Sequence, residues 1–400
     1  MMLTREFRLA AACCRRPGPE RDSAVRDAAR AIDWVAFAAV LRRQRIDGFA
    51  HRALADAAVT VPDAIAAALA QGAARTATGN LRAAAETARL GRVFADAGMP
   101  CLFVKGSTLA QLAWGTLATK YSKDIDLLVR PQDVDRGLAL LEADGYLLWL
   151  PAHHLTPAQR RIAIRHINEF VLVHPTRRLQ VELHWRLARN AALLPGLGAT
   201  SAVQQVALGG GACAATLTTP DLASYLAVHG AVHCWSRLKW LADFDALVGE
   251  QDVAALYDHA VALGAGRAFG QGLTLSRMLL GRTLPTEVAA RIAADRAIPA
   301  MTATALDLLA GGGATELDER PGAALRVTLA GLRLAPGWRF RAQALRQLLF
   351  TSYDAYRTPL PRALHGLYPV LRGPLWLIRL IRHRGRPPGE PPLPVARPLS

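Results

Sequence analysis

Cysteine is scarce in this chain, and long apolar runs are absent. The five cysteines are Cys13, Cys14, Cys101, Cys213 and Cys234. They are scattered, odd in number and form no C-x-x-C pair, which argues against a disulfide framework and suits a reducing cytoplasm. No stretch reaches the roughly 18 uncharged apolar residues that a membrane-spanning helix needs. The short apolar run near the N-terminus fits one face of a helix and lacks the cleavage pattern of a signal peptide.

Acidic residues are also few, with 32 aspartates and glutamates against 48 lysines and arginines, so the net charge is +16. From Arg320 to the end, 14 arginines face only Asp354 and Glu390. A basic region of this kind indicates an acidic neighbour such as nucleic acid, anionic lipid or an acidic substrate. An arginine-rich composition with solvated helix faces explains the charge equally well. Since 52% of the residues are hydrophobic, a sizeable core is expected and global disorder is excluded.

Hydrophobic periodicity divides the 400 residues into four parts. Residues 1–80 are predicted as an N-terminal helical segment, 81–190 as an α/β core and 215–385 as a C-terminal helical domain. Residues 386–400 are rich in proline and are predicted to be a disordered tail. Within the core, strands are expected over 100–106, 124–129, 170–174 and 179–185, with helices over 107–115 and 130–146.

Two aspartates stand one residue apart at the start of an apolar run, in "KYSKDIDLLV" (120–129). In a strand, Asp124 and Asp126 point to the same face, while Ile125 and Leu127 point into the core. Paired carboxylates repel each other unless a cation lies between them, and Mg²⁺ accepts such oxygen ligands together with substrate phosphates. An ion pair with Lys123 or a nearby arginine, without catalysis, is the alternative.

A later strand, "LQVELHW" (179–185), offers a third carboxylate. Glu182 and His184 share one face of this strand. If it lies beside "DIDLLV", Glu182 joins the two aspartates, and three carboxylates on neighbouring strands can hold two divalent ions for an in-line phosphoryl displacement. His184 is then positioned to tune the site or contact the triphosphate; a purely structural histidine fits as well.

A strand-to-helix turn precedes both strands in "VKGST" (104–108). Gly106 allows a phosphate to approach the backbone, and a helix starting near Ser107 offers free N–H groups to an anion. Lys105 and Lys123 add positive charge for a triphosphate.

The order of Gly106-Ser107, Asp124-x-Asp126 and Glu182 resembles the DNA polymerase β-like nucleotidyltransferase superfamily. More narrowly, "LFVKGSTLAQLAWG", "SKDIDLLV", "VELHW" and "HGAVHCWSRLKWLADFDALV" resemble a bacterial family of uncharacterised nucleotidyltransferases found beside natural-product and polysaccharide biosynthesis genes. The resemblance covers roughly residues 5 to 300.

This resemblance implies a role for each matching residue. Asp124, Asp126 and Glu182 would bind metal ions, and Glu182 would accept the proton of the attacking hydroxyl. Gly106 and Ser107 would hold the β- and γ-phosphates. Glu182 replaces the aspartate that is usual at the third position, and its longer arm still permits ligation.

The stretch "HGAVHCWSRLKWLADFD" (229–245) is the second informative segment. His229 and His233 lie four residues apart on one helical face. They predict either a basic wall of the nucleotide pocket, where Arg237 and Lys239 meet phosphates and a tryptophan stacks on the base, or packed core. Zinc binding is the weaker alternative because no third ligand has a recognised spacing.

The predicted fold is therefore α+β, a small mixed-sheet nucleotidyltransferase core flanked by N-terminal helices and a C-terminal helical domain. The predicted enzyme uses Mg²⁺, or Mn²⁺, and a nucleoside triphosphate (NTP) as co-substrate to modify a small molecule, sugar phosphate or modified peptide in a biosynthetic pathway. A catalytically weak nucleotide-binding or antitoxin-like module is the alternative, and an RNA-directed enzyme is suggested only by charge. The basic segment 373–386 would allow peripheral contact with an anionic membrane.

Overall fold

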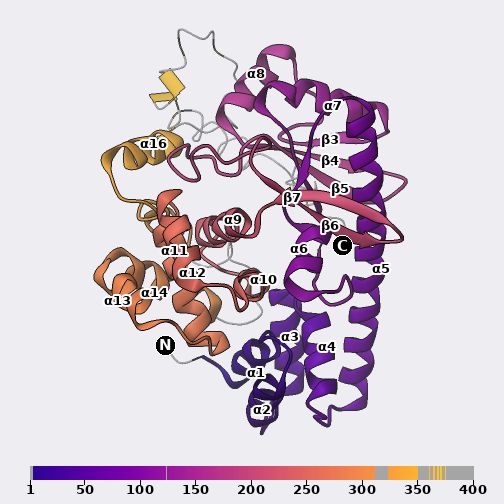
Figure 1. Ribbon diagram of the computed structural model, residues 1–400, viewed down its shortest axis with the longest axis vertical. Coiled ribbons are helices and arrows are strands. Elements are labelled where there is room, and N and C mark those ends of the chain that lie inside the picture. Colours follow the sequence, from indigo (N-terminus) through magenta and orange to yellow (C-terminus); the bar gives the residue numbers. More distant parts are fainter. Residues whose placement is uncertain are drawn as a thin grey trace.

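The computed structural model describes residues 3–122, 124–310 and 323–349, together with 360, 364, 367, 368, 370, 371 and 374. These residues form an α+β structure, as predicted (Figure 1). A small mixed sheet is preceded and followed in the chain by helices. Across these residues, no helix combines the length and apolar character needed to cross a membrane. The predicted tail (386–400) lies outside them, as does the basic segment 373–386 apart from Pro374.

Helices form the N-terminal part. They are α1 (Arg5–Cys13), α2 (Pro19–Ala28), α3 (Trp34–Gln44), α4 (Asp47–Asp56) and α5 (Asp63–Asp96). Thr4 starts α1 by accepting a hydrogen bond from the Phe7 N–H, and Asp33 caps α3 in the same way. The long helix α5 crosses the predicted boundary at residue 80 and continues along the sheet (Figure 1). The N-terminal helices and the core are therefore joined by a continuous helix.

The central sheet has the strand order β1-β2-β5-β4-β3. Its strands are β1 (Leu102–Phe103), β2 (Asp124–Leu128), β3 (Leu147–Leu150), β4 (Glu169–His174) and β5 (Leu179–His184). The helices between them are α6 (Gly106–Trp114), α7 (Val134–Ala143), which follows a short 3₁₀ turn, and α8 (Pro157–His166). Strands β2 and β5 are parallel, and the other pairs are antiparallel. The sheet is mixed, with β2 and β5 at its centre.

The two faces of the sheet differ in composition. Ile125 and Leu127 of β2 and Val181 and Leu183 of β5 pack in one apolar cluster with residues of α5 and α7. The alternate residues of the same strands, including Asp126 and Glu182, point to the opposite face. As the alternation predicts, successive side chains of each strand therefore point in turn to the apolar core and to the opposite, polar face.

A second, two-stranded sheet follows in a Gly/Ala-rich passage for which no strand was predicted. It is formed by β6 (Val203–Gly209) and β7 (Ala212–Leu217). The later helices are α9 (Thr219–Val232), α10 (Leu238–Val248), α11 (Val253–Ala262), α12 (Gly266–Leu275), α13 (Thr286–Ala294), α14 (Ala297–Ala310), α15 (Ala323–Gly331) and α16 (Trp338–Leu349), with a π-helical turn (Ser276–Leu280) after α12.

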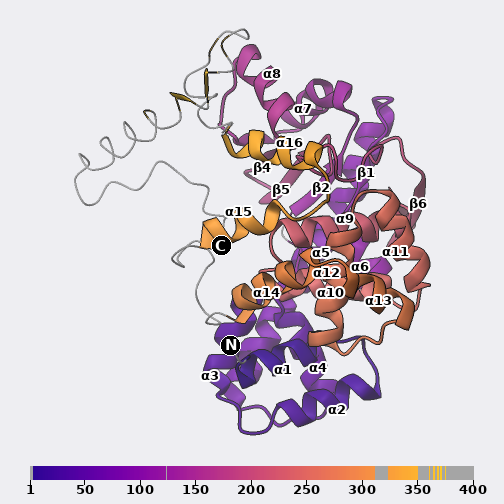
Figure 2. The same cartoon turned by 90° about the vertical axis from the view of Figure 1, so that its left-hand side faces the viewer.

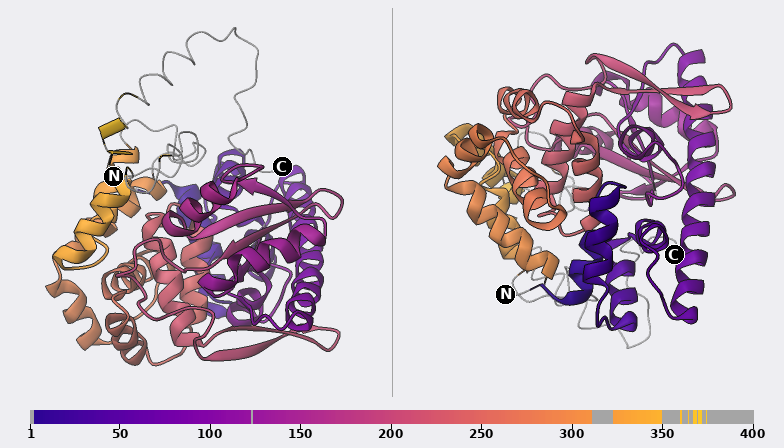
Figure 3. Two further views of the ribbon diagram at one scale, coloured as in Figure 1. Left: turned by 90° about the horizontal axis from the view of Figure 1, so that it is seen from above. Right: turned by 60° about the horizontal axis from the view of Figure 1, so that its bottom comes forward.

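The first helix packs against the π-helical turn that follows α12. Phe7 and Leu9 of α1 belong to the same buried cluster as Leu275 and Leu279 near the end of α12. In Figure 3 (right), α1 lies between α5 and the helices of the C-terminal half. The N-terminal and C-terminal helices therefore share a core, and the proposed division into separate domains remains a prediction.

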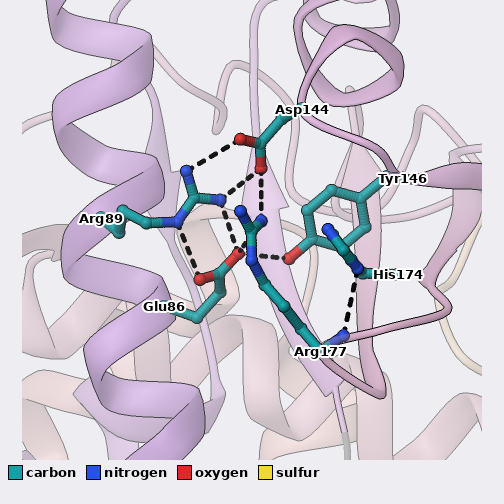
Figure 4. A network of polar contacts seen from close by, with 6 residues as sticks. All are labelled: Glu86, Arg89, Asp144, Tyr146, His174 and Arg177. Atoms are coloured by element: carbon teal, nitrogen blue, oxygen red, sulfur yellow. Dashed lines mark hydrogen bonds and ion pairs between the residues drawn. The ribbon is translucent and has the colours of Figure 1, made fainter.

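A polar network joins α5 to the segment between α7 and β3 and to the turn between β4 and β5 (Figure 4). Glu86 of α5 is 6% exposed and receives hydrogen bonds from Arg89 (2.6 Å), from the Tyr146 hydroxyl (2.7 Å) and from Arg177 (3.2 Å). Both arginines also bind Asp144. Burial opposes the charge of Glu86, but the hydrogen bonds from Arg89 and Tyr146 lower its pKa.

Removing the Glu86 carboxylate should destabilise the fold. We expect Glu86→Ala to lower the free energy of unfolding by about 3 kcal/mol, because Arg89 and the Tyr146 hydroxyl lose their buried partner. Since the folded-state pKa of Glu86 is depressed, this stabilisation is present at neutral pH and is lost as the pH falls through that pKa. Urea unfolding at pH 7 measures the change. Glu142→Ala, at an exposed position of α7, is the control and should cost far less.

Candidate active site

A cavity of about 630 Å³ lies on the polar face of the sheet, between β2 and β5 and the later helices. Most of the predicted site residues line it. They are Lys105, Gly106, Asp124, Asp126, Glu182, His184, His233 and Lys239. Segments more than 130 residues apart in the sequence therefore meet in one cavity.

The register of two parallel strands brings the carboxylates together. Asp126 of β2 is directly opposite Glu182 of β5, and Asp124 is opposite Gln180. Asp126 is 2% exposed, whereas Asp124 at the start of β2 is half-buried and lines the same cavity. The adjacency of the two strands, which the sequence left open, is present.

Two cationic groups meet the Oδ1 atom of Asp126. The Lys105 ammonium lies 2.7 Å from it, and the Nε2 atom of His184 lies 3.2 Å from it. Burial opposes ionisation of Asp126, but Lys105 and His184 hold its pKa well below the usual value. Asp126 is thus a carboxylate at neutral pH, and it forms an ion pair with Lys105, a residue that the alternative did not name.

His184 connects the other carboxylates. Its Nε2 lies 3.5 Å from Glu182 Oε2, and its Nδ1 lies 3.1 Å from Glu169 Oε2 at ion-pair distance. Burial opposes protonation of the ring, yet Glu169, Asp126 and Glu182 together raise the pKa of His184 to about 10. Burial and the charge of Asp124 raise the pKa of Glu182 to about 8. At neutral pH the His184 ring therefore carries a positive charge, and Glu182 is mainly protonated.

The donor atoms of this cluster are suitable for a hard divalent cation. Oxygens of Asp126 and Glu182 and a ring nitrogen of His184 all lie within 4.8 Å of one another. Carboxylate oxygens are the ligands that Mg²⁺ and Mn²⁺ prefer. For these hard ions carboxylate oxygens are better ligands than a ring nitrogen, and Asp124 adds a further carboxylate on the cavity wall.

The turn before α6 needs glycine. Gly106 begins the helix with a φ of +62°, and a Cβ there would lie 3.4 Å from the Asp124 carbonyl oxygen. The Thr108 hydroxyl donates to the Phe103 carbonyl (2.7 Å), which fixes the turn against the end of β1. The start of α6 therefore lies beside the start of β2, at the cavity wall.

Three cationic side chains, those of Arg45, Lys120 and Lys239, line another part of the cavity. Lys239 and Arg45 both lie over the ring of Tyr121, at 5.3 and 5.7 Å from its centroid, and Lys120 is 3.5 Å from Asp243. Burial, then the charge of Lys120, lowers the pKa of Lys239 to about 8. Half-buried cations such as Lys239 and Arg45 are suited to binding an anion.

Aromatic rings from α9 and α10 line the cavity beside these cations. The rings of His229 and His233 are 4.8 Å apart, and Trp240 lies 5.5 and 5.1 Å from them. Burial and the charge of Lys105 lower the pKa of His233 to about 4, and that of His229 is also lowered. The two histidines are therefore neutral at pH 7 and form an uncharged aromatic surface rather than a basic wall.

Two predicted residues are absent from the described lining of the cavity. Ser107 is buried and is absent from the described lining, and the Arg237 guanidinium donates to the Arg43 carbonyl instead of facing the cavity. Lys123 lies outside the described residues. The roles proposed for Ser107 and Arg237 in phosphate binding thus have no support from the lining.

Several lining residues were not anticipated from the sequence. Arg45 ends α3 in the left-handed region with a φ of 56°, an uncommon conformation that is enriched at ligand sites. Glu169 is the first residue of β4, beside the predicted strand 170–174. Lys120 and Tyr121 stand directly before the D-x-D segment, and only that proximity could have indicated them.

A carboxylate cluster on adjacent parallel strands lies next to a glycine-initiated helix in an α+β core, which is the arrangement that the resemblance to nucleotidyltransferases implies. A family model described as "Uncharacterised nucleotidyltransferase" matches residues 30–281, more than half of the chain. The protein belongs to this family and is a nucleotidyltransferase, which confirms the resemblance drawn from its motifs. Comparison with curated proteins and with solved structures gave no match.

Proposed function

We propose that the protein transfers a nucleoside monophosphate from an NTP to a hydroxyl or phosphate oxygen of a biosynthetic acceptor. The observation that carries this proposal is the pairing of Asp126 with Glu182 across two parallel strands, in a cavity that also holds Asp124, Lys105 and Gly106. The free state of all five cysteines supports a reducing cytoplasm as the compartment.

The proposed reaction forms one bond and breaks one. An acceptor oxygen bonds to the α-phosphorus, the bond from that phosphorus to the β-phosphate oxygen breaks, and pyrophosphate leaves in line. Asp124, Asp126 and Glu182 would hold Mg²⁺ or Mn²⁺, which when bound neutralises phosphate charge and orients the phosphates. Most of the rate then comes from positioning.

The chain's own side chains bind and orient the nucleotide. Lys105, Lys239 and Arg45 are cations that can meet the phosphates, and the start of α6 presents backbone N–H groups. Trp240 and the neutral rings of His229 and His233 offer a stacking surface for the base. Glu182, which lines the cavity opposite Asp126, is placed to accept the proton of the acceptor hydroxyl when its carboxylate is ionised.

The direct test is incubation of the protein with each radiolabelled NTP, Mg²⁺ and a cell extract. We expect pyrophosphate release and a labelled product that resists ribonuclease. A product destroyed by ribonuclease would indicate an RNA acceptor and would contradict a small-molecule substrate.

Nucleotide affinity should depend on pH through Lys239. Because burial lowers the pKa of Lys239 to about 8, its charge is present below pH 8 and is lost above it. We expect NTP affinity to fall about tenfold between pH 7 and pH 9, the value of one charge-assisted hydrogen bond. Calorimetry across this range measures the NTP affinity.

Glu182 titrates in the same interval. The variant Lys239→Arg keeps its charge up to pH 9, so the difference between its pH dependence and that of the wild type gives the contribution of Lys239. An unchanged pH dependence in Lys239→Arg would contradict this assignment.

One observation favours a catalytically weak nucleotide-binding module as the second candidate. Asp126 already has two cationic partners, Lys105 and His184, so its charge is balanced by protein groups alone. Nucleotide binding with Mg²⁺ but without pyrophosphate release, in the presence of extract, would support this candidate.

A further inference from the structure

The cavity has an apolar end that the nucleotide does not require. Apolar side chains line it from two segments that hydrogen bonds join, namely Leu187 and Leu193 after β5 and Phe340, Ala344 and Leu348 of α16. Phosphates, a ribose and a base need cations, polar groups and a stacking surface, and these lie on the other lining residues. The apolar end is therefore available to another ligand.

Residues 332–348 build half of this apolar wall. Leu332 and Leu334 follow α15, and Phe340, Ala344 and Leu348 lie on one side of α16. Figure 2 shows α16 over β4 and β5, and α15 beside α9. This half of the wall lies outside residues 30–281, which the family model matches.

Hydrogen bonds join α16 to residues 189 and 190, which follow β5 and its cluster residues Glu182 and His184 in the chain. The Gln347 side chain donates to the Arg189 carbonyl at 2.7 Å, and the Asn190 side chain donates to the Phe340 carbonyl at 3.1 Å. Leu187, the first apolar lining residue of this segment, is only three residues beyond His184. The apolar end thus adjoins the cluster where the acceptor oxygen must react.

We propose that the apolar end binds the aliphatic body of the acceptor, so that the substrate is an amphipathic alcohol or phosphate. This proposal rests on the proposed function. The acceptor must place one oxygen at the carboxylates, and the rest of it must occupy the adjoining space. A sugar or charged peptide would lose hydration against leucine and phenylalanine side chains without gaining partners, whereas an alkyl chain is stabilised there.

A homologous series of acceptors tests the proposal. Straight-chain n-alkyl phosphates and n-alkanols from two to ten carbons are offered with radiolabelled NTP and Mg²⁺. We expect kcat/KM to rise about fourfold for each added methylene until the apolar end is filled. Ala344→Trp fills that end and should abolish the chain-length dependence. Ala342→Trp, on the exposed side of the same helix, is the matched control and should retain it.

A binding measurement separates this inference from the proposed function. Calorimetry of n-octyl phosphate against ethyl phosphate is performed on the wild type, Ala344→Trp and Ala342→Trp without nucleotide. Tighter binding of the octyl compound that is lost only in Ala344→Trp supports the apolar subsite. If no transfer is detected in that case, the nucleotidyl-transfer proposal fails and the subsite stands. Equal binding of both compounds to the wild type overturns the subsite, and transfer to a polar acceptor would then leave the proposed function intact.

Discussion

Replacing Asp126 with asparagine is expected to reduce kcat/KM for pyrophosphate release by about 1,000-fold, the upper value for loss of one group that stabilises developing charge. Asp126 is the buried member of the carboxylate pair, and both Lys105 and His184 are oriented on its Oδ1 atom. The amide cannot replace the carboxylate as a metal ligand, and it leaves two cations without their shared partner. Steady-state kinetics with the best labelled NTP measures the loss.

The matched control for this substitution is Asp135→Asn. Asp135 is an exposed aspartate on α7 whose contact with Arg160 is remote from the cavity. It should retain the activity of the wild type. Circular dichroism of both variants checks that the fold is unchanged. An Asp126→Asn protein that is folded and keeps more than a tenth of the activity would contradict the assignment of Asp126 to the catalytic centre.

The strand faces could be predicted from the sequence because alternation has a period of two. In "DIDLLV" and "VELH" the period alone separates Ile125 and Leu183 from Asp126 and Glu182. What it could not provide is the strand order, since a parallel pair needs a long crossover and its partner is chosen by tertiary packing. The meeting of Asp126 and Glu182 was an assumption until the register of β2 and β5 was known.

Other features were missed because their signals are tertiary. Arg45 reaches the cavity from a helix end 79 residues before Asp124, and no local pattern links them. Arg237 was assigned to the cavity from helical spacing, but it lies at the N-terminal cap of α10, where its guanidinium contacts α3. The β6–β7 hairpin alternates weakly, because alanine and glycine fill many of its positions, so its strands did not stand out.

Lys105→Gln is the second substitution with a large expected effect, and its two consequences have opposite signs. The loss of a cation that meets the phosphates should reduce kcat/KM about 100-fold, the value of a strong charge-assisted hydrogen bond. In the absence of nucleotide, however, the Lys105 ammonium occupies the Oδ1 side of Asp126 at 2.7 Å and competes with a divalent cation for that carboxylate. Removing this charge should tighten binding of Mn²⁺ alone by about tenfold.

These opposite effects distinguish a phosphate-binding lysine from one that only neutralises Asp126. Electron paramagnetic resonance of free Mn²⁺ measures metal affinity without turnover, and calorimetry measures NTP affinity separately. Lys105→Arg retains the positive charge and should leave Mn²⁺ affinity close to that of the wild type. If Lys105→Gln tightens Mn²⁺ binding but leaves NTP affinity and kcat/KM unchanged, the lysine serves only as the counter-ion of Asp126. If Mn²⁺ affinity instead falls in Lys105→Gln, the two cations do not share the carboxylate, and the metal site lies elsewhere in the cavity.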